Sequence, residues 1–237
     1  MKKLCFILAS WLMAGSLNGL AAADTDASNL CTSGKNQSPV NIDSTKATTI
    51  MNRLRMGLKF NYGKLIPEDI VNTGNGLRLH VGEGANIQID GKTFALKYLD
   101  FHMPSENTVN KKHFPMEIEF YHEGDDKQPA AIVSMMVIPG KADRTLRKLL
   151  KQLPDKKGEA KPLAANTLKS LEMKKKLANY YRYSGSVTTA PCTEGVRWFI
   201  LKQPLSLSDE QQQAFKAAIG KDNNRPVQPL NARQILE

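Results

Sequence analysis

Hydrophobic and polar residues alternate in short runs through the middle of the chain, a pattern that predicts β-strands. Residues 86–96 read NIQIDGKTFAL, with Ile87 and Ile89 between polar neighbours and an Asp90-Gly91 pair typical of a hairpin turn. The connections between the runs carry Gly, Pro, Asn and Asp, which are common turn residues. Further strands are expected at residues 97–103, 114–122, 130–138 and 196–202.

Two segments have helical spacing instead. Residues 142–153 place four leucines on one face, with Asp143 as a plausible N-cap. Residues 208–220 begin with a capping box from Ser208 to Gln211 and end at Gly220. The lysine-rich segment 154–179 is expected to be a loop with some helix. The pattern as a whole predicts one mainly β domain with short peripheral helices.

The first 23 residues have the features of a secretory signal peptide. Lys2 and Lys3 precede a short apolar run, and residues 21–23 read AAA, a small-residue cleavage site. An uncleaved anchor is the alternative, but the apolar run is short. The expected domain comprises residues 24–237. The form of the leader indicates export to a bacterial periplasm. No later run reaches the roughly 18 apolar residues of a membrane span, so none is expected after the leader is removed.

The chain is basic, with 33 lysines and arginines against 23 acidic residues and a formal charge of +10. A solvated helical face is the favoured interpretation of this excess. The alternative is that the lysine-rich 142–176 face binds an anionic polymer or a membrane surface. No nucleic-acid partner is expected. Much of the excess is carried by seven of the lysines between residues 142 and 176: Lys156, Lys157, Lys161, Lys169, Lys174, Lys175 and Lys176.

Three cysteines become two when Cys5 leaves with the leader. Cys31 and Cys192 then remain in an oxidising compartment, where an even number favours a disulfide. A bridge between them would close a very long loop and stabilise the fold by ~5 kcal/mol in the chain-entropy picture. Two free thiols are the alternative.

Acidic residues and one histidine stand at strand spacing between residues 99 and 122. Asp100 and His102 are two residues apart, as are Glu117 and Glu119, so each pair shares one face of its strand. If the strands are neighbours, Asp100, His102 and Glu119 can converge as metal ligands, since imidazole and carboxylate both bind zinc. The alternative is an ordinary polar surface on an exposed sheet.

A wider set of motifs surrounds these residues and resembles the α-class carbonic anhydrase family across roughly residues 30–237. The resemblance implies a single domain around a large twisted, mostly antiparallel sheet, with a conical cleft reaching its centre. It also implies a disulfide between Cys31 and Cys192. The motifs are GKNQSPVNI at 34–42, IVNTGN at 70–75, PSENTV at 104–109, FPMEIEFYH at 114–122, the segment 180–208, and NNRPVQPLNARQIL at 223–236.

The resemblance implies a zinc ion held by three histidines, and this chain departs from that pattern. Asp100 and Glu119 stand at two of the three ligand positions, and only His102 is kept. His122 matches a family histidine outside the metal shell. Zinc is the metal implied by the family, but two carboxylates favour harder ions such as manganese or iron. A site that has lost its metal altogether is the other alternative.

Other matching residues retain the family's types. Glu106 and Thr188 match the pair that orients the metal-bound nucleophile, and Glu117 matches an acid that supports the third ligand. Asn75 stands where fast members carry a proton-shuttling histidine, so that shuttle is absent. The apolar wall that receives carbon dioxide corresponds to Val187, Val196 and Trp198.

The resemblance therefore predicts an exported carbonic-anhydrase-like protein with an altered Asp/His/Glu metal site. Carbon dioxide and bicarbonate are the expected substrates, and hydratase activity is expected to be weak or absent because two carboxylates neutralise a divalent ion before its water binds. One alternative is a non-catalytic binding module that uses the basic face. The other is a zinc carbonic anhydrase that works normally despite the substitutions.

Overall fold

The computed structural model describes residues 30–49, 58–63, 65–124, 129–168 and 179–237. The predicted leader at residues 1–23 lies outside the described residues. So do four lysines of the basic region: Lys169, Lys174, Lys175 and Lys176.

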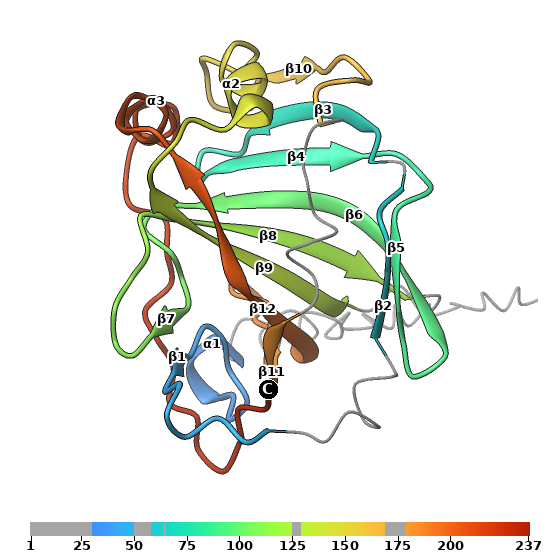
Figure 1. The fold of residues 1–237 in the computed structure, drawn as a ribbon, viewed down its shortest axis with the longest axis vertical. Coiled ribbons are helices and arrows are strands. Elements are labelled where there is room, and N and C mark those ends of the chain that lie inside the picture. The colour runs from blue at the N-terminus through green and yellow to red at the C-terminus, as the bar shows by residue number, and fades with distance from the viewer. Residues whose placement is uncertain (1–29, 50–57, 64, 125–128, 169–178) are drawn as a thin grey trace, which may run out of the picture.

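One large twisted sheet dominates the protein, and short helices lie at its margins (Figure 1). The helices are α1 (Leu30–Ser33), α2 (Arg144–Leu150) and α3 (Asp209–Ile219). The strands are β1 (Asn41–Ile42), β2 (Leu58–Asn61), β3 (Pro67–Asn72), β4 (Leu77–Val81), β5 (Asn86–Ile89), β6 (Lys92–His102), β7 (Thr108–Val109), β8 (Met116–Glu123), β9 (Pro129–Pro139), β10 (Ala160–Pro162), β11 (Tyr180–Ser186) and β12 (Glu194–Leu207).

The main sheet has ten strands, eight of them in the order β10-β3-β4-β6-β8-β9-β12-β11, with β5 pairing both β6 and β2. Its pairs are antiparallel except for β9 with β12, and β1 and β7 form a separate parallel pair. The predicted mainly β, mostly antiparallel architecture is confirmed. Among the described helices, none is long and apolar enough to cross a membrane.

Local signals in the sequence fix several of these elements. Asp90 and Gly91 both have positive φ, as the two-residue turn between β5 and β6 requires. Asp143 caps α2 by accepting a hydrogen bond from the backbone N–H of Leu146. The capping box at Ser208 and the left-handed Gly220 bound α3 as predicted. The segment 154–179, expected to be a loop with some helix, contains a short strand, β10, that pairs with β3, and its residues 169–178 lie outside the described part of the chain.

Hydrophobic residues pack on both faces of the main sheet. The larger cluster includes Phe101, which stacks on Phe215 of α3 with ring centroids 5.7 Å apart. The smaller cluster, on the opposite face, includes Trp198 and Tyr183, whose rings stack at 5.7 Å. Because Phe101 points toward α3, its neighbours Asp100 and His102 point to the other face of β6.

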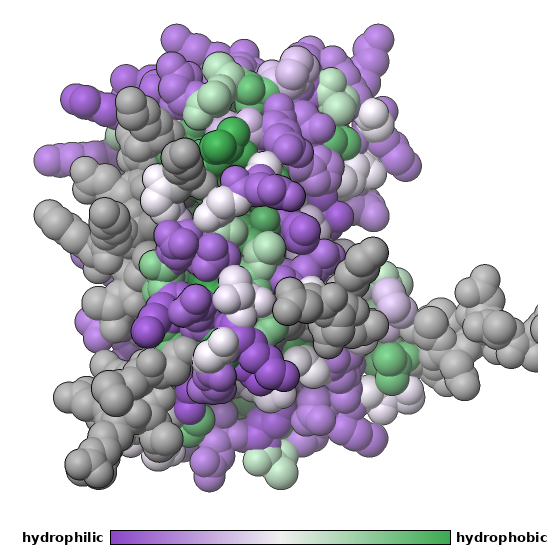
Figure 2. Space-filling model, turned by 90° about the vertical axis from the view of Figure 1, so that its right-hand side faces the viewer, coloured by the Kyte–Doolittle hydropathy of each residue, from purple (hydrophilic) through white to green (hydrophobic). Residues whose placement is uncertain are grey.

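The surface is largely polar. Figure 2 shows one face of the molecule, on which hydrophobic residues are scattered among hydrophilic ones. Ile66 and Val227 are the only large hydrophobic side chains exposed among the described residues. Isolated residues of this kind are usual on a protein surface and do not indicate a docking face.

Candidate metal centre

Neighbouring strands β6 and β8 bring the predicted site residues together. The two strands are antiparallel, with Asp100 opposite Glu119 and His102 opposite Glu117. Ile118 lies in the larger core cluster, so Glu117 and Glu119 point away from it, to the same face as His102. The predicted placement of these residues on one face of two adjacent strands is confirmed.

Three of the side chains form a compact buried cluster: His102, Glu106 and Glu119. One candidate ligand atom from each lies within 4.8 Å of the others. His102 Nδ1 is 3.4 Å from Glu106 Oε1, and His102 Nε2 is 3.7 Å from Glu119 Oε2. We call these three residues the buried cluster. Glu106 comes from the loop between β6 and β7, and it joins the cluster where sequence spacing had pointed to Asp100.

His102 is oriented by the C-terminal segment of the chain. Its Nδ1 lies 3.3 Å from the carbonyl oxygen of Asn223. A carbonyl only accepts, so this contact assigns a proton to Nδ1, and in the neutral ring the lone pair is then left on Nε2. The Asn223 side chain also binds the end of β6, accepting from the N–H of Met103 and donating to the carbonyl of Phe101. Asn223 therefore presents Nε2 as a ligand atom.

Each member of the buried cluster has one polar atom without a hydrogen-bond partner among the described residues: His102 Nε2, Glu106 Oε2 and Glu119 Oε1. The three residues are 7%, 2% and 4% exposed. Leaving such groups buried and unpaired is costly, so a site of this kind calls for a cation or a proton. One imidazole and two carboxylates are suitable ligands for zinc and for harder divalent ions.

Asp100 lies in an ion pair outside this cluster. Arg78 on β4 stands directly across from it and donates from Nε and Nη2 to its two carboxylate oxygens, at 2.8 and 2.7 Å. The guanidinium also lies over the ring of Tyr98, with its carbon 3.8 Å from the ring centroid, and Tyr98 stacks on Tyr121. Asp100 therefore has its charge compensated by the protein itself.

Burial and mutual repulsion change the protonation of the clustered groups. Burial raises the pKa of Glu119 well above its usual value, and the charges of Glu106, Glu117 and Asp100 raise it further. Burial also raises the pKa of Glu117. Burial opposes the charged form of His102, but the neighbouring carboxylates outweigh it and raise that pKa. The site therefore attracts positive charge, as protons or as a cation.

The structure records no hydrogen bond between Glu106 and Thr188, the two residues that the resemblance pairs. Glu106 Oε1 accepts a hydrogen bond from the backbone N–H of Arg225 at 2.8 Å. Its Oε2 has no hydrogen-bond partner in the described part of the chain, so the half-buried Thr188 does not donate to it. Glu106 thus has one carboxylate oxygen available for another ligand.

Glu117 has its hydrogen bonds within the protein. It accepts from the backbone N–H and the side-chain amide of Asn107, both at 2.8 Å, and from the hydroxyl of Ser134. These bonds fix the loop that carries Glu106. The structure records no hydrogen bond between Glu117 and Glu119, so the predicted support of a ligand by Glu117 stays a prediction.

The remaining predicted residues lie on β12, on the loop after β11 and in the turn between β3 and β4. Val196 and Trp198 are fully buried in the smaller core cluster, and Val187 packs against it. The Trp198 indole donates to the carbonyl of Ser186. Asn75 is exposed in the turn between β3 and β4. Val196 and Trp198 are therefore core residues in this structure, and their role as an apolar wall for carbon dioxide stays a prediction.

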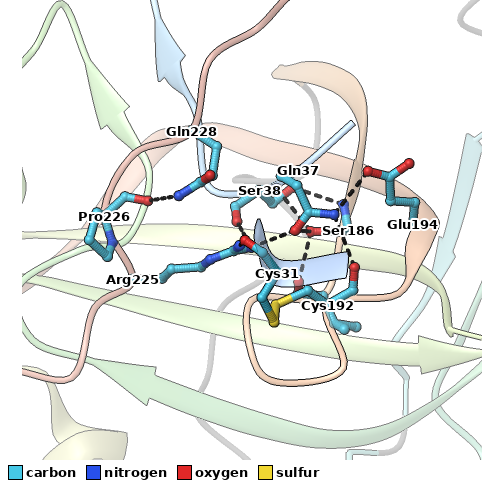
Figure 3. Close-up of a disulfide and its surroundings, with 10 residues drawn as sticks. Cys31, Gln37, Ser38, Ser186, Cys192, Glu194, Arg225, Pro226 and Gln228 are labelled. Carbon is cyan, nitrogen blue, oxygen red and sulfur yellow. Dashed lines mark hydrogen bonds between the residues drawn. A yellow bond between two sulfur atoms is a disulfide. The ribbon is translucent and has the colours of Figure 1, made fainter. Parts of the chain in front are cut away.

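A disulfide joins Cys31 to Cys192, as predicted, with Arg225 beside it (Figure 3). Arg225 also connects this region to the buried cluster. The Arg225 guanidinium donates to the carbonyl oxygens of Cys31 and Ser38 and to the side chain of Gln37. The same residue donates its backbone N–H to Glu106. Arg225, Asn223 and Arg78 are the residues that strand periodicity alone could not identify.

A separate cavity of about 560 Å³ lies beside β11 and β12. Three arginines line it, but Arg197 faces Asp90 at 3.6 Å and Arg233 donates to backbone carbonyl oxygens. Trp198 is the one predicted site residue in its wall. The cavity is distinct from the buried cluster and contains none of the three clustered side chains.

Known proteins are similar to this chain in both sequence and fold. The family model described as eukaryotic-type carbonic anhydrase matches residues 23–237. A carbonic anhydrase of Neisseria gonorrhoeae is 40% identical, covering 88% of this chain and 79% of that protein. One of Pectobacterium atrosepticum is 37% identical, with coverages of 87% and 82%. The solved α-carbonic anhydrase of Photobacterium profundum is 36% identical with a TM-score of 0.80, covering 90% of this chain and 94% of that one.

Fold and sequence together define a protein of the α-carbonic anhydrase type. The chain belongs to the carbonic anhydrase family, and the resemblance carried by its motifs is confirmed. Zinc is the metal that this family generally uses, and carbon dioxide and bicarbonate are the substrates that the family implies.

Proposed function

We propose that this protein is an exported member of the family with an altered metal centre, and that it hydrates carbon dioxide slowly or not at all. The observation that carries the proposal is the bidentate ion pair between Arg78 and Asp100. Asp100 stands where the resemblance expects a histidine ligand. A carboxylate already bound to a guanidinium through both oxygens is a poor substitute for that ligand.

The buried cluster is nevertheless chemically suited to a divalent ion. His102, Glu106 and Glu119 would hold it through atoms that otherwise lack partners. Zinc, when bound by three histidines, supplies a water whose pKa is lowered to about 7. Two carboxylates carry enough negative charge to neutralise the ion, so an ion held by them is expected to lower the pKa of its bound water less.

The chain's own residues also differ from those of a fast hydratase. Thr188 makes no hydrogen bond to Glu106, so the hydroxyl that should orient a nucleophile is not held by that carboxylate. Asn75 cannot titrate and therefore cannot relay protons. Val187, Val196 and Trp198 retain the apolar residue types with which the family receives carbon dioxide, so a substrate site can persist beside a weak catalytic centre.

Stopped-flow measurement of carbon dioxide hydration tests this proposal. The mature protein, residues 24–237, is assayed with one equivalent of added zinc near pH 7.5. Rates close to the uncatalysed reaction are expected. Fast hydration typical of an efficient zinc carbonic anhydrase would overturn the proposal and favour a working zinc enzyme.

Export belongs to the same proposal. The disulfide between Cys31 and Cys192 supports it, because such bonds persist in oxidising compartments. Fractionation of a bacterial host followed by N-terminal sequencing tests it. A periplasmic protein beginning near Asp24 is expected, whereas a cytoplasmic protein that keeps Met1 would contradict export.

Binding of an anionic polymer on the lysine-rich 142–176 face is a second candidate function. Lys156 and Lys157 are exposed there, which supports it. Lys161 contributes less, because its ammonium donates to Asp155 and to the carbonyl of Leu153. Such a role would use a surface distinct from the buried cluster, so it is compatible with a weak or absent hydratase.

A further inference from the structure

We infer that the metal ligands of this chain are His102, Glu106 and Glu119, so that Glu106 takes the place expected for Asp100. The inference rests on the altered metal centre proposed above and names its ligand set. It assigns Glu106 a different role from the pairing with Thr188 that the family resemblance implies. The assignment follows from which oxygens the protein leaves unpaired.

Spacing within the buried cluster suits a bound ion. Ligand atoms about 2.1 Å from a tetrahedral ion lie about 3.4 Å from one another. His102 Nε2 and Glu119 Oε2 are 3.7 Å apart, and one candidate atom from each of the three residues lies within 4.8 Å of the others. Small side-chain movements would therefore bring all three to ligand distance.

Hydrogen bonding favours Glu106 over Asp100. Both oxygens of Asp100 accept from Arg78, so binding a metal there would first break two charge-assisted hydrogen bonds. Glu106 uses one oxygen for the backbone N–H of Arg225 and leaves the other unpaired in a buried site. A ligand at that second oxygen would satisfy an atom that is otherwise costly to bury.

The surroundings hold both Glu106 and His102 in place. Glu117 fixes Asn107, next to Glu106 in the chain, through two hydrogen bonds. Asn223 orients the His102 ring so that Nε2 carries the lone pair. Ligands positioned in this way lose little freedom on binding a metal, which is how support by neighbouring residues raises affinity.

The charge of the set selects the kind of ion. One neutral imidazole and two carboxylates together carry two negative charges, which match a divalent cation. The site would take zinc, and its oxygen-rich donors also suit manganese(II) or iron(II). Magnesium and calcium fit less well, because they prefer oxygen ligands alone.

Metal-binding measurements on matched variants test the assignment. Isothermal titration of the metal-free mature protein with Zn²⁺ is compared among the native chain, Glu106→Gln and Asp100→Asn. Both substitutions remove one carboxylate charge and keep the side-chain shape. We expect a loss of zinc affinity of at least about 100-fold in Glu106→Gln, since ligand loss should exceed the 10–100-fold cost typical of losing a supporting residue. In Asp100→Asn we expect at most about a threefold change.

Three outcomes would overturn the assignment. The first is native affinity retained in Glu106→Gln, the second a large loss in Asp100→Asn, and the third no zinc binding by the native chain. Circular dichroism and thermal melting of each variant separate a lost ligand from a lost fold. Failure here would leave the slow-hydration proposal standing, because the stopped-flow assay tests that proposal separately.

Discussion

Arg78 on β4 binds both carboxylate oxygens of Asp100 on β6, directly across the strand pair. A fixed positive charge therefore stands beside an acid that occupies a ligand position of the carbonic anhydrase family. The guanidinium is further held over the Tyr98 ring. The protein thus pairs Asp100 with an internal cation, whereas Glu106 and Glu119 each have an oxygen without a hydrogen-bond partner among the described residues.

Replacing Arg78 by methionine should lower the free energy of unfolding by about 1–2 kcal/mol. The side chains of Arg78 and Asp100 are 30% and 20% exposed, so the loss should be smaller than the 3–5 kcal/mol typical of breaking a fully buried pair. Urea unfolding near pH 7 measures it. The double variant Arg78→Met/Asp100→Asn should recover most of the loss, and equal stability of the single variant and the native chain would show that the pair contributes nothing.

Acid should destabilise the protein partly through His122. Burial lowers the pKa of His122 to about 3, and its Nε2 accepts a hydrogen bond from the Tyr62 hydroxyl. The unfolded chain takes up a proton on this residue near pH 6.5, whereas the folded chain does so only near pH 3. The free energy of unfolding should therefore fall as the pH is lowered from about 6.5 to about 3, by on the order of 4 kcal/mol from this residue.

The variant His122→Gln isolates that contribution, because glutamine does not titrate. Unfolding is measured by urea titration at several pH values for both chains. The native chain should lose more stability than the variant between pH 6.5 and 3. Parallel curves would mean that His122 is not held neutral in the folded state.

Reducing the disulfide should weaken both the fold and the metal site. The bond links residues 161 positions apart, and its loss should lower the free energy of unfolding by about 2–5 kcal/mol. Cys31 accepts from Arg225, which in turn donates to Glu106, so zinc affinity should fall as well. Guanidinium unfolding and zinc titration of Cys31→Ser/Cys192→Ser measure the two effects. Unchanged zinc affinity would show that Glu106 is positioned without this connection.

The basic face can be tested by charge reversal at two exposed lysines. If the lysine-rich 142–176 face binds anionic polymers, Lys156→Glu/Lys157→Glu should elute from heparin at lower salt than the native chain. Reversal at Lys35 and Lys46, two further lysines that are exposed, provides a control with the same net charge. Equal shifts in the eluting salt concentration for both variants would indicate a general charge effect. If heparin does not retain the native chain at low salt, binding of anionic polymers by this face is excluded.

Local sequence signals predicted much of the fold and part of the site. Asp90-Gly91 and Ser208 act through neighbouring residues, so their turn and cap could be read directly from the sequence. Alternation along β6 and β8 placed His102 and Glu119 on one face correctly. β10 was missed because three residues give little periodicity and its pairing with β3 depends on the tertiary fold.

The partners of the site residues could not be predicted in the same way. Arg78 meets Asp100 only because β4 pairs with β6, a contact that strand spacing within one segment does not encode. Asn223 reaches His102 from 121 residues away along the chain. Periodicity therefore indicated which side chains share a face, while the pairing of strands and the path of the C-terminal segment decide which of them remain free to bind an ion.

The rate of carbon dioxide hydration, measured side by side for two zinc-loaded chains, tests the central claim most directly. One is the native mature protein, and the other is Arg78→Asn/Asp100→His/Glu119→His, which removes the competing guanidinium and restores histidines at both altered positions. We expect the native rate to lie near the uncatalysed reaction and the variant to exceed it by about 100-fold or more, since zinc then has three neutral ligands. A native rate already as fast as that of an efficient carbonic anhydrase would contradict the account.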